Sequence, residues 1–519
     1  MTHGSKYSLM ASLMLAAGLL VVSQGALAAP PDKVRVIVAM KPGSASAMRQ
    51  AVAASRGEIK HEIQGQDAFA IEVPEQALKG LANNPNVLYI ETDERRYPLS
   101  STPSTGTPYA LGQKVPYGIP MVQADQLSDA LAGNRKICII DSGYDRAHQD
   151  LDSGANITGE YDAGTGWWYT DENHHGTHVA GTIAALNNSG VGVVGVNANR
   201  NIKLHIVKVF GASGWAYSST LATAANKCKA AGANIITMSL GGGRSNRTEQ
   251  RTFDSLYSGG VLLVAAAGND GTTALSYPAG YSSVISVGAL DASKAWASFS
   301  QYNSKVEISA PGVAVLSTVP MGSGRASALS VGSTTYAPGG MDGSPVKTAS
   351  APLFDFGIGN ATNAGAAGKI CLIARGTVDF STKVSNCQTS GGVGAIVYNN
   401  AAGSYGGTLG TTVTTIPSVT ASDTEGTALR AQLGQTATVA VTGANYAEFD
   451  GTSMATPHVS AVAALVWSRN LGCTAAQLRT SLNSSAQDLG PAGRDTKFGF
   501  GLVQAKAADD RIKARGCGK

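Results

Sequence analysis

The chain has 519 residues, more than one ordinary domain needs, so we expect about three domains. Only 14% of the residues are charged and the formal net charge is +4, a balance that offers no basic stripe for nucleic acid. Glycine is abundant at 63 residues, which favours a loop-rich α/β protein with tight turns over a helical bundle.

Residues 1–28 have the pattern of a secretory signal peptide. Lys6 precedes an apolar run at 9–22, and Ala26-Leu27-Ala28 offers a cleavage site before Ala29. The run is short for a membrane span, so a permanent anchor is the weaker interpretation. We therefore expect a secreted protein, extracellular or periplasmic, with no stable membrane anchor in its mature form.

Residues 34–97 form a self-contained unit. Apolar periodicity predicts strands at 34–40, 57–64, 68–74 and 87–93, with helices at 44–55 and 75–84. This βαββαβ order is that of the ferredoxin-like split motif. The stretch that follows, 98–111, is rich in Ser, Thr, Pro and Gly, and we expect it to be an exposed, cleavable linker.

From Lys136 onward, buried apolar strands alternate with helices. The predicted strands are 136–141, 205–210, 235–240, 261–268 and 284–290. Near-continuous apolar runs of this kind are typical of a parallel sheet covered on both faces. Ligands bind beyond the carboxyl ends of such strands, and Asp141, Ser239 and Asn269 lie at these ends.

Six cysteines, an even number, suit an oxidising compartment. Connectivity cannot be deduced from sequence alone, and free buried thiols are the alternative. The positions suggest three local pairs: Cys138 with Cys228, Cys371 with Cys387, and Cys473 with Cys517.

Three distant segments each place one member of an Asp/His/Ser set at the edge of a regular element. They are Ile139-Ile140-Asp141-Ser142-Gly143, His175-Gly176-Thr177-His178-Val179-Ala180-Gly181-Thr182, and Gly451-Thr452-Ser453-Met454-Ala455-Thr456-Pro457-His458. The chain order Asp, His, Ser is that of the subtilisin type of triad. From Gly112 to Val503, apart from one insertion, the chain resembles the subtilisin-like serine proteases, or subtilases. The resemblance implies a doubly wound, mainly parallel α/β sheet built from 112–320 and 446–519.

The resemblance also suggests roles for the two remaining segments. Lying between a signal peptide and a subtilase domain, 29–99 looks like the family's inhibitory propeptide, whose tail occupies the active site until cleavage within 98–111. Residues 321–445 interrupt the protease pattern with a strand at 368–376, a helix at 382–390 and a strand at 394–399. They resemble an inserted protease-associated (PA) domain, and a decorative insert specific to this chain is the alternative.

The family match implies a role for each of four residues. Ser453 would be the nucleophile at a helix N-terminus, and His175 the general base that takes its proton. Asp141 would hold the tautomer of His175, and Asn269 would donate to the oxyanion beside the backbone N–H of Ser453. Considered in isolation, a helix cap, a turn-capping Asp or an Asn in a left-handed turn would explain these residues equally well.

Other polar residues compete for these roles. Asp145 has already left the strand, and His174 lies outside the family motif. His178 is one helical turn on from His175 and faces another direction, while His458 is expected to be packed and hydrogen-bonded. The histidine cluster also invites a zinc site, but no H-E-x-x-H pattern is present.

Substrate binding follows from the same comparison. Ser213-Gly214-Trp215 and Ser239-Leu240-Gly241 correspond to the two edge segments that sandwich an extended peptide by strand addition. Small, uncharged walls predict a preference for Phe, Tyr, Leu or Met before the cut bond. The walls of this pocket are Ala266, Ala267 and Gly268, with Ser276 at the floor.

The loop after the His175 helix resembles a structural calcium site of the subtilisins. Oxygen ligands of this kind suit a hard cation. The loop is one residue longer than the family pattern, which leaves the choice of carbonyls open. The matching positions are Gln113, Asp150, Leu186, Asn188 and Gly192.

Together these features predict a secreted, self-maturing serine endopeptidase. It would act on proteins and peptides, with its own propeptide as an intramolecular inhibitor and no nucleic-acid partner. The alternatives are a catalytically silent binding protein that works through the PA domain, and a metal-dependent hydrolase.

Overall fold

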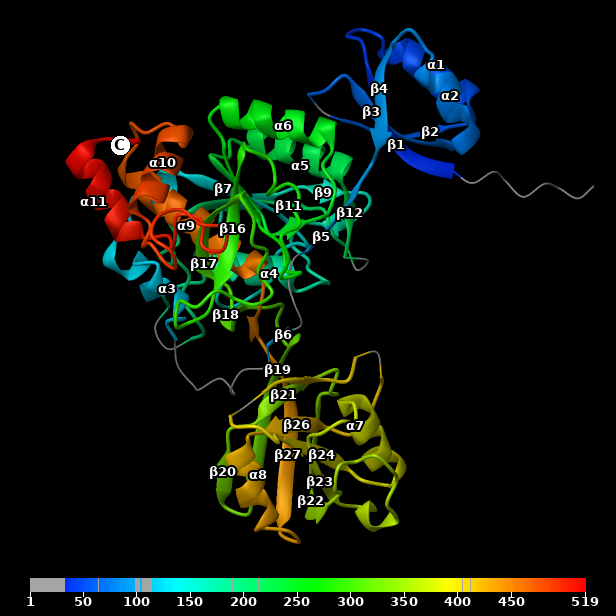
Figure 1. Ribbon diagram of the computed structural model, residues 1–519, viewed down its shortest axis with the longest axis vertical. Helices are drawn as coiled ribbons and strands as arrows, with labels where there is room; N and C mark the ends of the chain where they lie inside the picture. The colour runs from blue at the N-terminus through cyan, green and yellow to red at the C-terminus, as the bar shows by residue number, and fades with distance from the viewer. Residues whose placement is uncertain are drawn as a thin grey trace, which may run out of the picture.

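The computed structural model describes residues 33–519 except for seven short gaps. The expected signal peptide and most of the linker 98–111 lie outside the described residues. A small N-terminal domain, a large central domain and an insertion domain are separate bodies (Figure 1). None of the helices in the described ranges is long and apolar enough to span a membrane. The gaps are Gln64, 99–102, 105–113, 189–190, 212–213, Ser404 and Thr411.

The N-terminal domain has the expected βαββαβ order. Its four strands form an antiparallel sheet in the order β2-β3-β1-β4, which is the ferredoxin-like arrangement. Met48 and Val52 of α1 pack on the apolar face of this sheet. The elements are β1 (Lys33–Met40), α1 (Ala45–Ala54), β2 (Glu58–Glu62), β3 (Ala68–Pro74), α2 (Leu78–Ala82) and β4 (Val87–Thr92).

A seven-stranded parallel sheet forms the centre of the large domain, in the order β17-β16-β15-β13-β7-β11-β8. The predicted mainly parallel α/β sheet is therefore confirmed. The strands are β7 (Lys136–Asp141), β8 (Ile157–Gly159), β11 (Lys203–Lys208), β13 (Ile235–Met238), β15 (Leu262–Ala266), β16 (Val284–Leu290) and β17 (Val306–Pro311).

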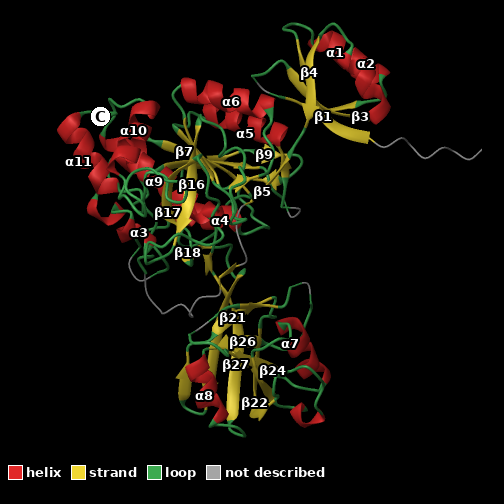
Figure 2. Ribbon diagram, in the orientation of Figure 1, coloured by secondary structure: helices red, strands yellow, loops and turns green. Residues whose placement is uncertain are grey.

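Helices cover both faces of this sheet (Figure 2). Successive side chains of a strand point to opposite faces. In β7, Ile137 and Ile139 join the apolar core with α4 and α9, whereas Cys138 and Ile140 join a second core with α5 and α6. The helices are α4 (His175–Ala184), α5 (Ser218–Ala230), α6 (Arg247–Ser258) and α9 (Thr452–Arg469), and α3 (Gly118–Met121), α10 (Ala475–Ser485) and α11 (Ala505–Arg515) complete the domain.

Five of the seven strands were expected from the sequence. β8 is too short for a periodic signal, and β17 ends in Pro311 and carries Glu307, so neither gives the apolar run of a central strand. Both lie at the edges of the sheet, where such a run is not needed.

The structure contains the three expected disulfides. Cys138–Cys228 joins β7 to α5, and Cys371–Cys387 lies within the insertion domain. Cys473–Cys517 ties the C-terminal end to the segment before α10. Each bond crosslinks neighbouring elements, and the described residues include no free cysteine.

The insertion domain leaves the large domain through an antiparallel pair, β18 (Val315–Thr318) and β28 (Tyr446–Phe449). The expected strand-helix-strand at its centre is present as β23, α7 and β24, and its nine strands form one sheet. Its elements are β19 (Gly324–Val331), β20 (Thr334–Tyr336), β21 (Gly339–Asp342), β22 (Lys347–Asp355), β23 (Ile370–Ala374), α7 (Phe380–Thr389), β24 (Gly394–Tyr398), β25 (Gly407–Thr408), β26 (Ser418–Ala421), α8 (Asp423–Arg430) and β27 (Thr436–Ala444).

Candidate active site

Asp141 and His175 meet at the carboxyl edge of the central sheet. Asp141 is the last residue of β7 and His175 the first of α4. His175 Nδ1 lies 2.7 Å from Asp141 Oδ1, and both side chains are buried. His175 Nε2 is also buried and has no hydrogen-bond partner among the described residues. The contact therefore orients the ring and leaves Nε2 to act as a base.

A short polar chain holds these two residues together. Ser142 Oγ accepts the Gly176 N–H at 2.8 Å and donates to Asp171 Oδ1 at 2.8 Å. Asp171 Oδ2 in turn accepts the Thr177 N–H at 2.8 Å, which satisfies a free donor of the first helical turn. We did not expect a role for Asp171 from the sequence, although an Asp shortly before a helix start is a recognised capping signal.

Ser453 lies in the first turn of α9, which packs against α4. Ser239 Oγ donates to the backbone carbonyl of Ser453 at 2.8 Å, so the end of β13 is linked to the start of α9. Ser453 therefore lies at a helix N-terminus, as predicted. There the helix dipole favours negative charge.

Asn269 is held beside Ser453 through Thr452. Its Oδ1 accepts both the Thr452 N–H at 2.9 Å and the Thr452 hydroxyl at 2.8 Å. With Oδ1 engaged by two donors, Nδ2 is the end of the amide that can donate to a substrate oxygen. Thr452 Oγ1 also accepts the Gly268 N–H at 3.2 Å. Thr452 is thus a positioning residue that sequence reasoning did not identify.

We expect Asn269→Ala to lower kcat by about 10²–10³-fold with little change in KM, because in the predicted role its Nδ2 would donate to the oxyanion of the transition state. That size was measured in subtilisin. Steady-state kinetics on a chromogenic peptide would test it, with Asn386→Ala in the insertion domain as the control. A tenfold rise in KM at constant kcat would contradict the oxyanion role.

Two further histidines of the motifs are packed, as was expected for His458. His178 stacks on Phe449 with ring centroids 4.3 Å apart, and its Nε2 contacts the carbonyl of Val315 at 2.9 Å. His458 Nδ1 contacts the carbonyl of Met454 at 2.8 Å. Burial lowers the pKa of His178 to about 3 and the pKa of His458 to about 4. Both rings are therefore neutral in the folded protein.

These lowered pKa values predict a loss of stability in acid. An unfolded histidine has a pKa of about 6.5, so below that pH only the unfolded state takes up the proton. The stabilisation is complete above about pH 6.5 and is lost as the pH falls towards 4. Both proteins carry Ser453→Ala, which prevents self-digestion. Between pH 7 and pH 5, we expect the free energy of unfolding of the protein that also carries His458→Asn to fall by about 2 kcal/mol less than that of Ser453→Ala alone. Equal losses in urea titrations would refute this.

A strand from the N-terminal side already lies between two edges of the large domain. β5 (Arg95–Pro98) pairs antiparallel with β12 (Ala216–Tyr217) on one side and with β14 (Leu240–Gly241) on the other. Pro98 is opposite Leu240, which follows Ser239, the residue bonded to Ser453. The end of β5 therefore points towards Ser453.

One of the two predicted edges is displaced along the chain. The prediction named Ser213, Gly214 and Trp215, but the residues that pair with β5 are Ala216 and Tyr217. The Gly214 N–H bonds back to Gly211 O at 3.0 Å and Gly214 has a φ of +67°, so the chain turns there and becomes extended only afterwards. Ser213 lies outside the described residues. The other edge agrees, because Leu240 and Gly241 pair with β5.

The residues of the predicted specificity pocket lie together. Ala266 ends β15, and Ala267 and Gly268 follow it. A Cβ on Gly268 would lie 3.3 Å from Ser276 Cβ and 2.4 Å from Gln301 Cγ. Gly268 also has a φ of +116°, so a side chain there is excluded by both space and backbone conformation. Gln301 also packs against Gly268, and the sequence did not predict it as a residue of this pocket.

The proposed calcium ligands are also neighbours. Asp150 accepts the Asn188 amide at 2.8 Å and the Val193 N–H at 2.8 Å, and Leu186 N–H donates to Asp150 O at 3.0 Å. Gly192 O accepts the Lys114 N–H at 2.6 Å, while Gln113 lies outside the described residues. Burial raises the pKa of Asp150 to about 6, and Asn188 Oδ1 is buried with no hydrogen-bond partner among the described residues. A buried carboxylate and an unsatisfied oxygen fit a hard cation.

The profile of the subtilase family, peptidase S8, matches residues 133–344 and 325–501, which is more than half of the chain. The chain belongs to the subtilase family. Subtilisin NAT of Bacillus subtilis subsp. natto is 35% identical over 288 residues, covering 54% of this chain and 70% of that protein. Subtilisin DY of Bacillus licheniformis is 42% identical over 217 residues, covering 40% of this chain and 76% of that protein.

Solved structures agree with this assignment. The psychrophilic subtilisin-like protease Apa1 from the Antarctic psychrotroph Pseudoalteromonas sp. AS-11 is 44% identical with a TM-score of 0.62, covering 78% of this chain and 100% of that one. Fervidolysin from Fervidobacterium pennivorans, at 22% identity and a TM-score of 0.59, shares the fold over 92% of this chain and 61% of its own. This subtilase is a subtilisin-like serine endopeptidase.

Proposed function

We propose that this subtilase is a secreted endopeptidase that uses Asp141, His175 and Ser453 as its triad and matures by cutting its own chain. The observation that carries the proposal is the position of β5. A segment of the protein's own chain is bound in extended form between β12 and β14, and its end points towards Ser453. Strand addition of this kind is how a protease holds a peptide substrate.

The chemistry follows from the positions of the side chains. His175 Nε2 takes the hydroxyl proton of Ser453 as the oxygen attacks the substrate carbonyl, and Asp141 stabilises the imidazolium that forms. Asn269 Nδ2 and the Ser453 N–H donate to the oxyanion. His175 then gives the proton to the leaving amine, and water releases the acid from the acyl-enzyme by the same steps.

Two strand pairings limit the range in which the self-cleaved bond can lie. Pro98 pairs with Leu240 on one side of Ser453, and β6 (Pro103–Ser104) pairs with β28, which ends at Phe449, shortly before Ser453. We therefore place the cut bond between Pro98 and Pro103, within the predicted range 98–111. The ferredoxin-like domain would act as the propeptide and its tail as the intramolecular inhibitor.

A fluorophosphonate probe tests the proposed activity, because it labels a serine only when that serine is activated. We expect labelling of the mature wild-type protein at Ser453, together with hydrolysis of casein. Among short substrates, Ala-Ala-Pro-Phe should be cleaved faster than Ala-Ala-Pro-Arg, because the pocket beside Gly268 has small, uncharged walls. A protein that neither labels nor hydrolyses casein would be the silent binding protein instead.

We also propose that the loop around Asp150 and Asn188 binds a structural calcium ion. The cation would neutralise the buried carboxylate and bind the oxygen of Asn188. Because a ligand that binds only the folded state raises its stability, EDTA should lower the thermal midpoint of Ser453→Ala, and calcium should restore it. Asp150→Asn should abolish most of this response. An equal midpoint with and without EDTA would rule the site out.

A further inference from the structure

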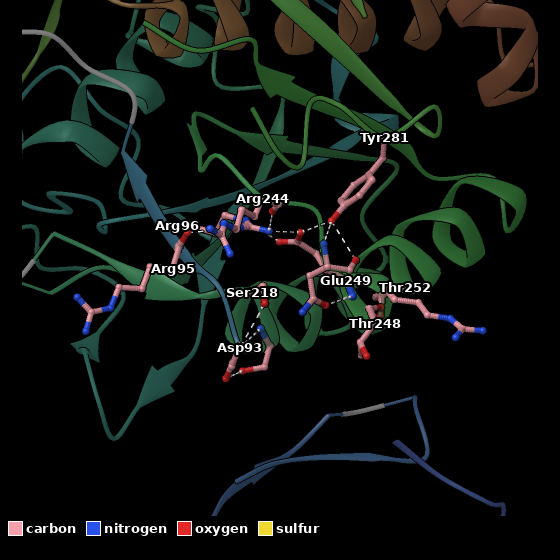
Figure 3. A network of polar contacts seen from close by, with 12 residues as sticks. Asp93, Arg95, Arg96, Ser218, Arg244, Thr248, Glu249, Thr252 and Tyr281 are labelled. Atoms are coloured by element: carbon pink, nitrogen blue, oxygen red, sulfur yellow. Dashed lines mark hydrogen bonds and ion pairs between the residues drawn. The ribbon is translucent and has the colours of Figure 1, made fainter. Parts of the chain in front are cut away.

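The side chain of Arg96 is buried against Glu249 and the Arg244 carbonyl of the large domain, a place that we call the Arg96 pocket (Figure 3). Arg96 is in the middle of β5, and its side chain is 0% exposed. Its Nε donates to Glu249 Oε1 at 3.1 Å and its Nη2 to Glu249 Oε2 at 2.7 Å, a bidentate pair. Nη2 also donates to the backbone carbonyl of Arg244 at 2.9 Å. The guanidinium is therefore bound by a carboxylate and a carbonyl of the large domain.

Besides Arg96, Glu249 is bonded to residues of the large domain. Glu249 is in the first turn of α6, and its N–H donates to Asn246 Oδ1 at 2.9 Å. Tyr281 Oη donates to Glu249 Oε2 at 2.7 Å. Burial, together with the Glu249 carboxylate, raises the pKa of Tyr281, so the phenol keeps its one proton, for which Glu249 Oε2 and the Asn246 carbonyl at 3.0 Å are the two acceptors. We expect these contacts to position the carboxylate before a peptide binds.

A guanidinium suits this pocket better than other side chains. A buried carboxylate is costly unless a cation and hydrogen bonds compensate it. Arginine supplies a planar fork of donors for both carboxylate oxygens and one more for the carbonyl of Arg244. Lysine carries the charge but cannot make the bidentate contact, and glutamine lacks the charge.

The contact between Arg96 and Glu249 is made by the paired strand β5 and is separate from the contacts that dock the N-terminal domain. That domain docks through carboxylates upstream of β5: Asp93 accepts the Ser219 N–H at 3.0 Å, and Glu91 accepts the Thr248 N–H at 2.9 Å. Arg96, by contrast, is opposite Ala216 of β12 within the paired segment. A substrate that adds to β12 and β14 in the same register places its corresponding side chain against Glu249.

We propose that this pocket is a substrate subsite for arginine, with Glu249 as its specificity-determining residue. The mature enzyme would prefer peptides with arginine two residues before the residue that faces Leu240. The proposal rests on the proposed endopeptidase function and adds a substrate class to it.

Quenched fluorescent peptides that carry the chain's own sequence from Asp93 to Ser104 test this with the mature wild-type enzyme. Replacing Arg96→Gln in the peptide should lower kcat/KM by about 30-fold or more, the usual size for breaking a buried charged pair, with Arg96→Lys intermediate. Arg95 is the matched control, because its guanidinium lies over the Trp215 ring at 4.4 Å on the exposed side. Arg95→Gln should change kcat/KM by less than about 3-fold.

The enzyme variant Glu249→Gln supplies the reciprocal test. In it the preference for the arginine peptide over the Arg96→Gln peptide should fall to a few-fold, and if the variant does not fold, the wild-type peptide series decides alone. Casein hydrolysis separates the two proposals. An enzyme that digests casein but cleaves both peptides equally has no arginine subsite, and Arg96 then only anchors the propeptide. An enzyme that cleaves neither casein nor any peptide overturns the proposed function and the subsite with it.

Discussion

Ser453→Ala is expected to lower kcat by about 10⁶-fold, the size measured for the nucleophile of subtilisin. The Ser453 hydroxyl is the attacking group of the proposed mechanism. Its residue is held in the first turn of α9, where the Ser453 carbonyl accepts from Ser239 Oγ and the neighbouring Thr452 N–H donates to Asn269 Oδ1. Folding should be preserved, because alanine suits a helix and the backbone contact with Ser239 does not need the Ser453 side chain.

The matched control is Ser460→Ala, two turns further along the same helix. Ser460 is equally buried, but its hydroxyl only donates to the carbonyl of Thr456 at 3.2 Å. We expect its kcat within a factor of about two of wild type, since a single helix-internal hydrogen bond contributes little. Hydrolysis of a chromogenic peptide measures both variants. Substantial activity in Ser453→Ala, after exclusion of contaminating protease, would show that Ser453 is not the nucleophile.

Asp141→Asn is expected to lower kcat by about 10⁴-fold while leaving KM nearly unchanged. The carboxylate lies 2.7 Å from His175 Nδ1 and so requires that nitrogen to carry the proton. An asparagine can turn its NH₂ group towards the ring, which favours the other tautomer and puts the proton on Nε2. The ring could then no longer accept the proton of Ser453.

Asp145→Asn makes the same chemical change four residues away. Asp145 accepts backbone N–H groups of Ala147 and Met321, and an amide oxygen can replace one of these acceptors. It should keep kcat within about threefold of wild type, as expected for a residue away from the reacting atoms. If both variants lost activity equally, Asp141 would have no special role.

The predictable parts of the fold are the elements whose own residues carry the pattern that identifies them. A strand buried on both faces must be apolar along its length, so runs such as Ile137 to Ile140 identify β7 without any knowledge of its neighbours. A helix that begins with a polar residue after such a strand is equally visible. Asp141 and His175 were therefore placed correctly at the edge where they meet.

The parts that were missed depend on partners far away in the chain. β12 is two residues long and exists as a strand because β5 pairs with it, so no local pattern marks its start. Glu249 has the ordinary position of an acidic residue in a first helical turn. Only the fold reveals that Arg96, 153 residues earlier, is bound to it.

We infer that the tail of the N-terminal domain is bound as the substrate of its own protease. Intact mass and N-terminal sequencing of the secreted wild-type protein and of Ser453→Ala test it most directly. We predict a wild-type chain that begins within 99–103 and a variant that keeps the N-terminal domain covalently attached. Cleavage of both proteins at the same bond would show that another protease does the processing, and would contradict the account.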